Sequence, residues 1–146
     1  MSMLGTGTVT NRREARVVAL QVLCEVDVVR HEAASILGEL FSDLDIMTSH
    51  SEFISDLVEN VLVNIEELDN IITDYAPSWP IWQIAVVDRN IIRLAVAEIK
   101  WLTETPEGAV INEAVELAKA FGAEGSPGFV NGVLGSFVVS VPKSDS

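Results

Sequence analysis

Three arginines near the start of the chain are the residues best suited to binding an anion. Arg12, Arg13 and Arg16 lie within five positions, although the whole chain has only 9 basic residues against 22 acidic ones. A guanidinium binds phosphate oxygens through two hydrogen bonds and can stack on an unpaired base. Cations in the first turns of a helix oppose its dipole, which costs about 0.3–1 kcal/mol each. The cluster indicates either a phosphate-binding site or a solvated basic helix end, and the residues alone leave both open.

A second group of basic residues lies in the middle of the chain. Arg89 and Arg93 stand four positions apart, with Lys100 two turns further on. Residues four apart share one face of a helix. The row is either a second basic patch for a partner or a solvated helix face.

Motifs for catalysis and metal binding are missing from the sequence. It contains no Gly-x-Ser-x-Gly elbow, Walker loop, dinucleotide fingerprint or zinc pattern. His31 and His50 lack partners at metal-ligand spacing, and the acidic residues between 52 and 74 are spaced like the solvent-facing side of a helix. We therefore expect no enzyme, no metal and no cofactor.

Helical periodicity dominates the elements that must position these residues. Apolar side chains recur at helical spacing over residues 11–26, 33–44, 51–75 and 84–102. Asn11 is a suitable N-cap for the first of these helices. The 51–75 pattern is one long helix or two joined near Asn64. Pro77 and Pro80 separate it from the next helix, which is expected to end near Thr103.

Two further helices are expected between residues 105 and 140. Thr105 and Pro106 suit an N-cap and first turn, Gly122 suits a left-handed residue after the helix, and Ser126 and Pro127 repeat the opening signal. The alternative for the last segment is a β-strand, because residues 137–139 are aromatic and β-branched, but the 3.6-residue period favours a helix.

Glycines in the last helix need an explanation. Gly128, Gly132 and Gly135 fall on one helix face, and each costs about 1 kcal/mol relative to alanine. We expect another backbone to approach this face closely.

Length and patterning predict an all-α protein of six or seven helices. We expect a flexible segment over 1–10, one helical domain over 11–140 and a tail over 141–146. The single cysteine, Cys24, excludes an internal disulfide, and no apolar run reaches the roughly 18 residues of a membrane span. We therefore expect a cytoplasmic protein without a membrane partner.

The net charge of −13 constrains the partners. It opposes nonspecific binding to nucleic acid, because that binding depends on Lys and Arg displacing counterions from phosphates. It is compatible with a basic protein partner, although acidity also favours solubility alone.

The C-terminal helices carry the motif of a known family. The string VINEAVELAK at 110–119, followed by Phe121-Gly122 and by SPGFVNGVL at 126–134, resembles the C-terminal signature of the NusB family of transcription antitermination factors. The strings RREAR at 12–16 and ALQ at 19–21, with VDR at 87–89 and IRL at 92–94 up to Glu98, agree in order. The resemblance covers about residues 12–138.

The resemblance implies a fold, a function and partners. The fold would be two packed three-helix bundles. The function would be that of a transcription antitermination and rRNA-maturation factor without catalytic activity. It would bind boxA-type RNA together with NusE, a small-subunit ribosomal protein, within the transcription elongation complex.

Site residues follow from the resemblance position by position. The RNA-binding set is Arg12, Arg13, Arg16, Gln21, Lys119 and Phe129. The partner-binding set, on the helix that contains residues 88–98, is Arg89, Arg93 and Glu98. A core position for Phe129 remains an equal alternative from the residues alone, and an exposed ring there would stack a base.

The chain departs from the family pattern at three positions. Cys24 replaces an aromatic residue, Gln83 replaces a basic one, and Gly125 replaces an acidic one. The first two changes predict weaker intrinsic RNA affinity, and the third slightly favours RNA.

Two other functions are compatible with the pattern. One is a structural homodimer that hides the last helices or the arginine face. The other is the detached NusB-like domain of an rRNA cytosine methyltransferase, although we expect no room for a cofactor-binding Rossmann domain in a chain ending at Ser146.

Overall fold

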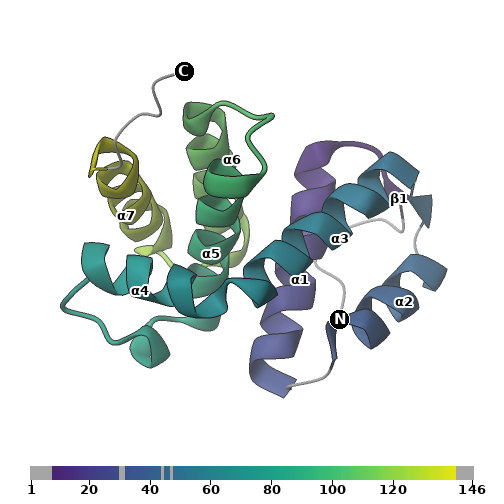
Figure 1. Ribbon diagram of the computed structural model, residues 1–146, viewed down its shortest axis with the longest axis horizontal. Helices are drawn as coiled ribbons and strands as arrows, with labels where there is room; N and C mark the ends of the chain where they lie inside the picture. Colours follow the sequence, from purple (N-terminus) through teal and green to yellow (C-terminus); the bar gives the residue numbers. More distant parts are fainter. Residues whose placement is uncertain (1–7, 30–31, 44, 47, 141–146) are drawn as a thin grey trace. The chain divides into compact units, whose positions relative to one another are not determined.

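The computed structural model describes residues 8–29, 32–43, 45–46 and 48–140. These residues form seven α-helices, one short 3₁₀ helix and two strands of two residues each. The chain divides into two compact units, residues 1–63 and 64–146 (Figure 1). The all-α prediction is confirmed. Residues 1–7 of the expected flexible segment and the expected tail, 141–146, lie outside the described residues. His31 also lies outside them.

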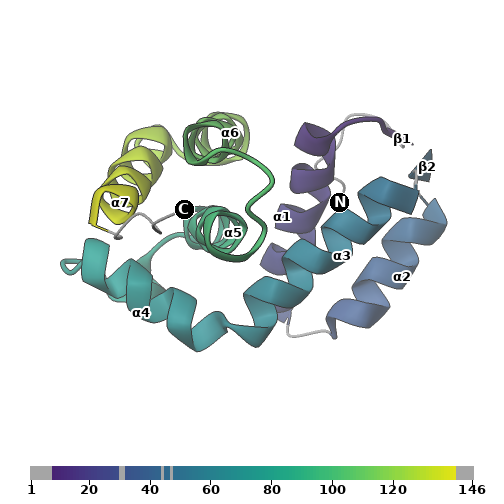
Figure 2. The same cartoon turned by 45° about the horizontal axis from the view of Figure 1, so that its top comes forward.

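The first unit is built from three helices. Helix α1 spans Arg12–Val29, α2 spans Ala33–Asp43 and α3 spans Thr48–Val63. Each helix contacts the other two, and both views show α2 beside α3 (Figures 1 and 2). Fully buried apolar residues of α1 and α3 include Ala19, Leu20, Val22, Ile54 and Leu57. The helical periodicity of the sequence therefore located this core correctly.

Two short strands flank the first two helices in the sequence. Strand β1, Thr8–Val9, pairs in parallel with β2, Asp45–Ile46. Val9 is only 2% exposed, so the chain is anchored before α1 begins. The sequence predicted neither strand, because two residues are too few to show an alternating pattern. Thr8 and Val9 thus belong to an ordered element within the expected flexible segment.

The 51–75 pattern forms two helices rather than one. Helix α3 ends at Val63, and α4 spans Ile65–Tyr75. Asn64 separates them with a φ of −107° and a ψ of 23°, outside helical geometry. Asn is a common helix-boundary residue, so the second of the two predicted alternatives is the observed one.

The second unit contains four helices arranged around α5. Helix α5 spans Val86–Trp101 and contacts α4, α6 (Glu107–Phe121) and α7 (Ser126–Ser140). Residues 90–98 of α5 are all buried, as expected for a central helix. A 3₁₀ turn, η1, at Ile81–Gln83 joins α4 to α5. Helix α7 confirms the helical alternative for residues 137–139.

Gly122 is required for a different reason than expected. Its φ of −93° is not left-handed, so the predicted left-handed conformation is wrong. A Cβ at this position would lie 2.6 Å from Ser126 Cβ and 2.8 Å from the carbonyl oxygen of Ala118. Ser126 must come this close because its hydroxyl accepts a hydrogen bond from the Ala123 amide at 2.8 Å. Glycine therefore permits a tight turn between α6 and α7.

The glycines of α7 do not contact another backbone among the described residues. A Cβ added at Gly128, Gly132 or Gly135 would meet no atom within 4 Å. The expectation of a close backbone approach is therefore wrong for the residues that the structure describes. Gly128 and Gly132 instead line a shallow hollow that also includes Tyr75 and Trp79.

Candidate nucleic-acid interface

The start of α1 is fixed by a network of capping hydrogen bonds. The Glu14 amide donates to Asn11 Oδ1 at 2.8 Å, and the Thr10 amide and hydroxyl both donate to Glu14 Oε1 at 2.7 Å. The predicted N-cap, Asn11, is thus confirmed. The hydroxyl bond of Thr10, and then its amide bond, hold the pKa of the Glu14 carboxyl below its ordinary value, with a smaller contribution from His50. The network therefore fixes the residue at which α1 begins.

Two of the three arginines converge on one aromatic ring. Arg12 Cζ lies 3.9 Å, and Arg16 Cζ 5.4 Å, from the ring centroid of Phe53 on α3. Both distances allow cation–π attraction. Arg16 is 7% exposed and Phe53 is 7% exposed, whereas Arg12 is half-buried. We call Arg12, Arg16 and Phe53 the arginine–phenylalanine cluster.

Arg13 and Gln21 occupy other positions on α1. Arg13 is exposed, so its guanidinium is accessible from solvent. Gln21 is half-buried and lies nine residues after Arg12, which is about two and a half helical turns. Gln21 therefore lies on the side of α1 opposite Arg12. The structure brings Arg12 and Arg16 together and does not bring Gln21 to them.

Lys119 and Phe129 belong to the second unit. Lys119 is in the last turn of α6, where its ammonium group pairs with Glu116 at 3.4 Å and its side chain is 62% exposed. Phe129 is on the first turns of α7 and is half-buried. The Phe129 side chain is therefore neither buried in the core nor fully exposed.

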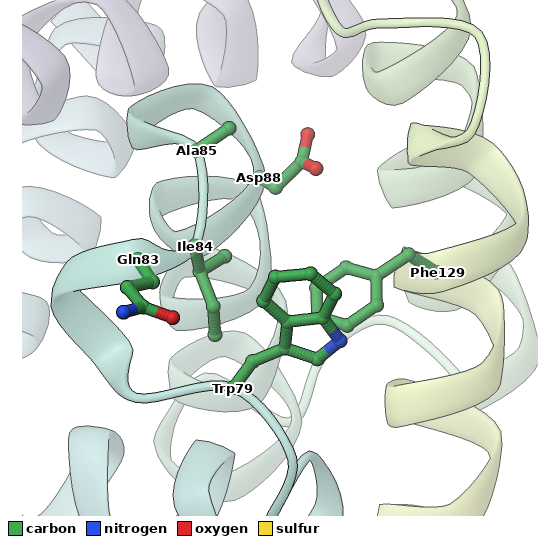
Figure 3. Close-up of a pocket in the computed structure, with 6 residues that line it drawn as sticks. All are labelled: Trp79, Gln83, Ile84, Ala85, Asp88 and Phe129. Atoms are coloured by element: carbon green, nitrogen blue, oxygen red, sulfur yellow. The ribbon is translucent and has the colours of Figure 1, made fainter.

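Phe129 lines a cavity of about 290 Å³ within the second unit (Figure 3). The other lining residues come from the segment between α4 and α5 and from the first turn of α5: Trp79, Gln83, Ile84, Ala85 and Asp88. Asp88 is 9% exposed, and its Oδ1 has no hydrogen-bond partner in the described part of the chain. Trp79 is 52% exposed. We call this cavity the Asp88 pocket.

Comparison with known proteins finds a family match over most of the chain. The pattern that defines the NusB family matches residues 13–138. The chain belongs to the NusB family. The transcription antitermination protein NusB of Dehalococcoides mccartyi is 41% identical over 127 residues, covering 87% of this chain and 89% of that protein. NusB of Herpetosiphon aurantiacus is 41% identical over 137 residues, covering 92% and 93%.

Solved NusB structures share the fold. T. maritima NusB superposes with a TM-score of 0.83 at 30% identity, covering 90% of this chain and 92% of that one. A chain from a crystal structure of the antitermination factors NusB and NusE in complex with dsRNA superposes with a TM-score of 0.80 at 30% identity, covering 89% and 97%.

The predicted partner-binding residues on α5 are buried or half-buried in the structure. Arg93 is 7% exposed, and its Nε and second terminal nitrogen donate to Asp69 at 2.7 and 2.9 Å. Glu98 is 2% exposed. Both side chains are therefore buried in this structure, and their role in binding NusE stays a prediction. Arg89 is half-buried and donates to the carbonyl oxygen of Ile84 at 3.0 Å.

The predicted basic row is consequently not an open cationic face. Lys100 pairs with Glu67 at 3.2 Å, so it and Arg93 both bind acidic residues of α4. Arg89 and Arg93 do lie four apart on one helix, but the sequence does not show that α4 places carboxylates opposite Arg93 and Lys100.

Three site residues escaped the sequence reasoning. Phe53 directly precedes the apolar stripe of α3 and carried no signal of its own. Asp88 stands out in the sequence only as part of the VDR string at 87–89. Trp79 had one usable signal, because an indole in a Pro-rich turn is an unusual exposed residue.

The described helices include none long and apolar enough to cross a membrane, and the described His, Cys, Asp and Glu side chains form no group of three that could hold a metal.

Proposed function

We propose that this chain is a transcription antitermination and rRNA-maturation factor that binds boxA-type RNA together with NusE. Its relatives are named transcription antitermination proteins, and a structural neighbour is described as NusB with NusE and dsRNA. In this proposal the chain is a binding factor without catalytic activity that acts in the cytoplasm on the elongation complex.

The observation that carries the proposal is the arginine–phenylalanine cluster. A guanidinium held against an aromatic face keeps its N–H groups and its outer face available to a phosphate or a base. The half-buried Arg12 is ordered in advance by Phe53, and the exposed Arg13 stands next to it. We propose that these two arginines contact RNA directly and that Arg16 positions them.

Lys119, Phe129 and Gln21 complete the proposed RNA surface. Phe129 is open enough for a base to reach its ring, and Lys119 has an exposed ammonium group paired only loosely on the helix surface. Gln21 would read a base edge away from the cluster. We propose that Arg89, the least buried of the three α5 residues, contacts the partner, with Arg93 and Glu98 in supporting positions.

The charge of the chain explains why a partner is needed. With a net charge of −13, the chain repels RNA at long range, whereas a basic ribosomal protein is attracted to it. The joint surface of the two proteins is less negative than this chain alone. We therefore expect tight RNA binding only in the complex with NusE.

The deciding experiment is a binding titration of a short boxA-like RNA with this chain, with NusE, and with their mixture over a series of salt concentrations. The mixture should bind most tightly. Arg13→Ala should weaken binding and reduce the slope of log K against log salt by about 0.7, the value for one phosphate contact to single-stranded nucleic acid. Lys100→Ala removes the same charge at a site outside the RNA set and should leave the slope unchanged. A mixture that neither forms a complex nor binds RNA would contradict the proposal and favour the homodimer, which sedimentation would detect.

A further inference from the structure

The carboxylate of Glu14 ties the first turn of α1 to the segment before it. Glu14 Oε1 accepts hydrogen bonds from the amide and the hydroxyl of Thr10, both at 2.7 Å, and the Glu14 amide donates to Asn11 Oδ1 at 2.8 Å. Thr10 directly follows strand β1, and Val9 of that strand is 2% exposed. Through Thr10, Glu14 therefore fastens the first turn of α1 to a buried residue.

Arg12 and Arg13 are the first two residues of α1, and they destabilise the turn that carries them. The amides of a first turn have no carbonyl partner within the helix, so helices fray at this end. Positive side chains there oppose the helix dipole, whereas a negative side chain is favourable. Glu14 is the acidic residue of this first turn. It therefore counteracts fraying both by its charge and by its bonds to Thr10.

We propose that Glu14 is a positioning residue for RNA binding, which keeps the first turn of α1 helical so that Arg12 and Arg13 meet RNA from a fixed backbone. Glu14 does not contact RNA itself, because its carboxylate would repel a phosphate. The inference rests on the proposed function and adds to it a residue that acts through the two arginines. When the first turn is frayed in part of the molecules, the apparent dissociation constant rises in inverse proportion to the fraction that remains helical.

Charge alone predicts the opposite effect of Glu14. In a chain with a net charge of −13, an acidic residue next to Arg13 weakens the attraction of RNA. If Glu14 contributed only negative charge, removing it would strengthen RNA binding. If it positions the arginines, removing it weakens RNA binding although the surface becomes less negative. The sign of the change therefore separates the two roles.

The test measures the affinity of the mixture of this chain with NusE for a short boxA-like RNA at fixed salt. Glu14→Ala should weaken binding about 2- to 5-fold, which corresponds to a helical first turn in about half to one fifth of the molecules. Thr10→Val removes the hydroxyl donor and no charge. It should weaken binding by a smaller factor, because the amide bond of Thr10 remains. Thr10→Ser keeps the hydroxyl donor and should bind like the wild type.

Two matched controls account for the lost charge and the lost hydroxyl. Glu52→Ala removes the same charge from an exposed position of α3 and should not weaken RNA binding. Thr73→Val removes a hydroxyl bond within α4, to the carbonyl oxygen of Asp69 at 2.9 Å, and should leave RNA affinity unchanged. In the free protein, hydrogen exchange of the Glu14 amide should become faster in Thr10→Val and not in Thr73→Val.

A double-mutant cycle shows whether Glu14 acts through the arginines. In a chain that already carries Arg12→Ala and Arg13→Ala, adding Glu14→Ala should no longer weaken RNA binding, because no guanidinium remains on the first turn to be positioned. A general loss of stability would instead weaken binding equally in both backgrounds. Circular dichroism at the temperature of the assay confirms that each variant is folded.

The outcomes separate the role of Glu14 from the function. If RNA binds, and Glu14→Ala strengthens binding or leaves it unchanged, the inference is overturned and the proposed function stands. Equal weakening by Glu14→Ala with and without the two arginines would also overturn the inference. If the mixture does not bind RNA at all, both proposals fail.

Discussion

Replacing Phe53 by leucine should weaken RNA binding although the residue itself is buried. Phe53 is 7% exposed, so it contributes almost nothing to the surface that RNA can reach. Its ring lies 3.9 Å from Arg12 Cζ and 5.4 Å from Arg16 Cζ. Leucine keeps an apolar side chain at this site and removes the π face. Both arginines would then lose their common anchor and sample more conformers.

The expected loss of RNA affinity follows from the free energy needed to order the Arg12 side chain on binding. Immobilising one long side chain costs about 0.5–1.5 kcal/mol, which Phe53 offsets in advance for Arg12. The dissociation constant should therefore rise by about 2- to 12-fold. Stability should also fall, because the cation–π attraction of Arg12 and Arg16 is worth about 0.5–2 kcal/mol each, and the smaller side chain leaves a cavity.

The assay compares affinity and salt dependence in the mixture with NusE. Phe53→Leu leaves every cation in the chain, so the number of phosphates contacted and the slope of log K against log salt should not change. Phe53→Tyr retains the ring and should bind like the wild type. Phe137→Leu is the matched control: Phe137 is 2% exposed, and its ring contacts Tyr75 edge-on at 5.9 Å in the second unit. It should lose stability without losing RNA affinity.

Two results would refute the reasoning on Phe53. The first is a folded Phe53→Leu protein that binds RNA as tightly as the wild type, which would mean that the ring does not order Arg12. The second is a reduced salt slope in Phe53→Leu, which would mean that a phosphate contact itself was lost. Equal weakening by Phe137→Leu would show that any loss of stability has this effect.

Four further predictions concern the remaining features. Asn11→Ala should lower the free energy of unfolding by about 0.5–2 kcal/mol in chemical denaturation, through loss of the α1 cap. The pKa of Glu14 is lower in the folded than in the unfolded chain, where it is near 4.5. The carboxylate therefore stabilises the fold above the unfolded pKa, and this stabilisation is lost as the pH falls through the folded pKa. A Glu14→Gln protein should lack this part of the loss of stability in acid. Asp69→Ala should destabilise the chain by about 3 kcal/mol, because it leaves Arg93 buried without its carboxylate, and an unchanged urea midpoint would contradict this. Gly132→Ala should stabilise α7 by about 1 kcal/mol, because its Cβ meets open space, and a lower melting temperature would contradict the assigned helix.

The sequence predicted the helices well because apolar periodicity and capping residues are local signals. Asn11 and Pro106 mark helix starts within a residue of those observed, and the alternative of a break near Asn64 was correct. The two-residue strands were missed, because their pairing joins segments about 37 residues apart. Gly122 was recognised as a terminator, but its cause is the approach of Ser126, which only the packed helices reveal.

The site was predicted less completely, because its contacts join different helices. Arg12, Arg13 and Arg16 stand out by charge, whereas Phe53 is one apolar residue of α3 among several. The sequence alone suggests that Arg93 is a surface cation, whereas in the structure Asp69 Oδ1 of α4 lies 2.7 Å from Arg93 Nε. Asp88 is ordinary as an acidic residue in the first turn of a helix. Only the burial of Oδ1, which has no hydrogen-bond partner among the described residues, distinguishes it, and burial is a property of the assembled unit.

The acidity of the chain and its proposed binding to RNA are compatible if affinity comes from a few ordered cations. A long-range field cannot attract RNA to a protein with a net charge of −13. Each cation that contacts RNA must then act at short range, where ordering cost decides its net contribution. Phe53 reduces that cost for Arg12, and a basic partner reduces the repulsion from the rest of the surface. It follows that RNA binding to the mixture should depend more steeply on salt than binding to this chain alone, because the partner adds phosphate contacts of its own.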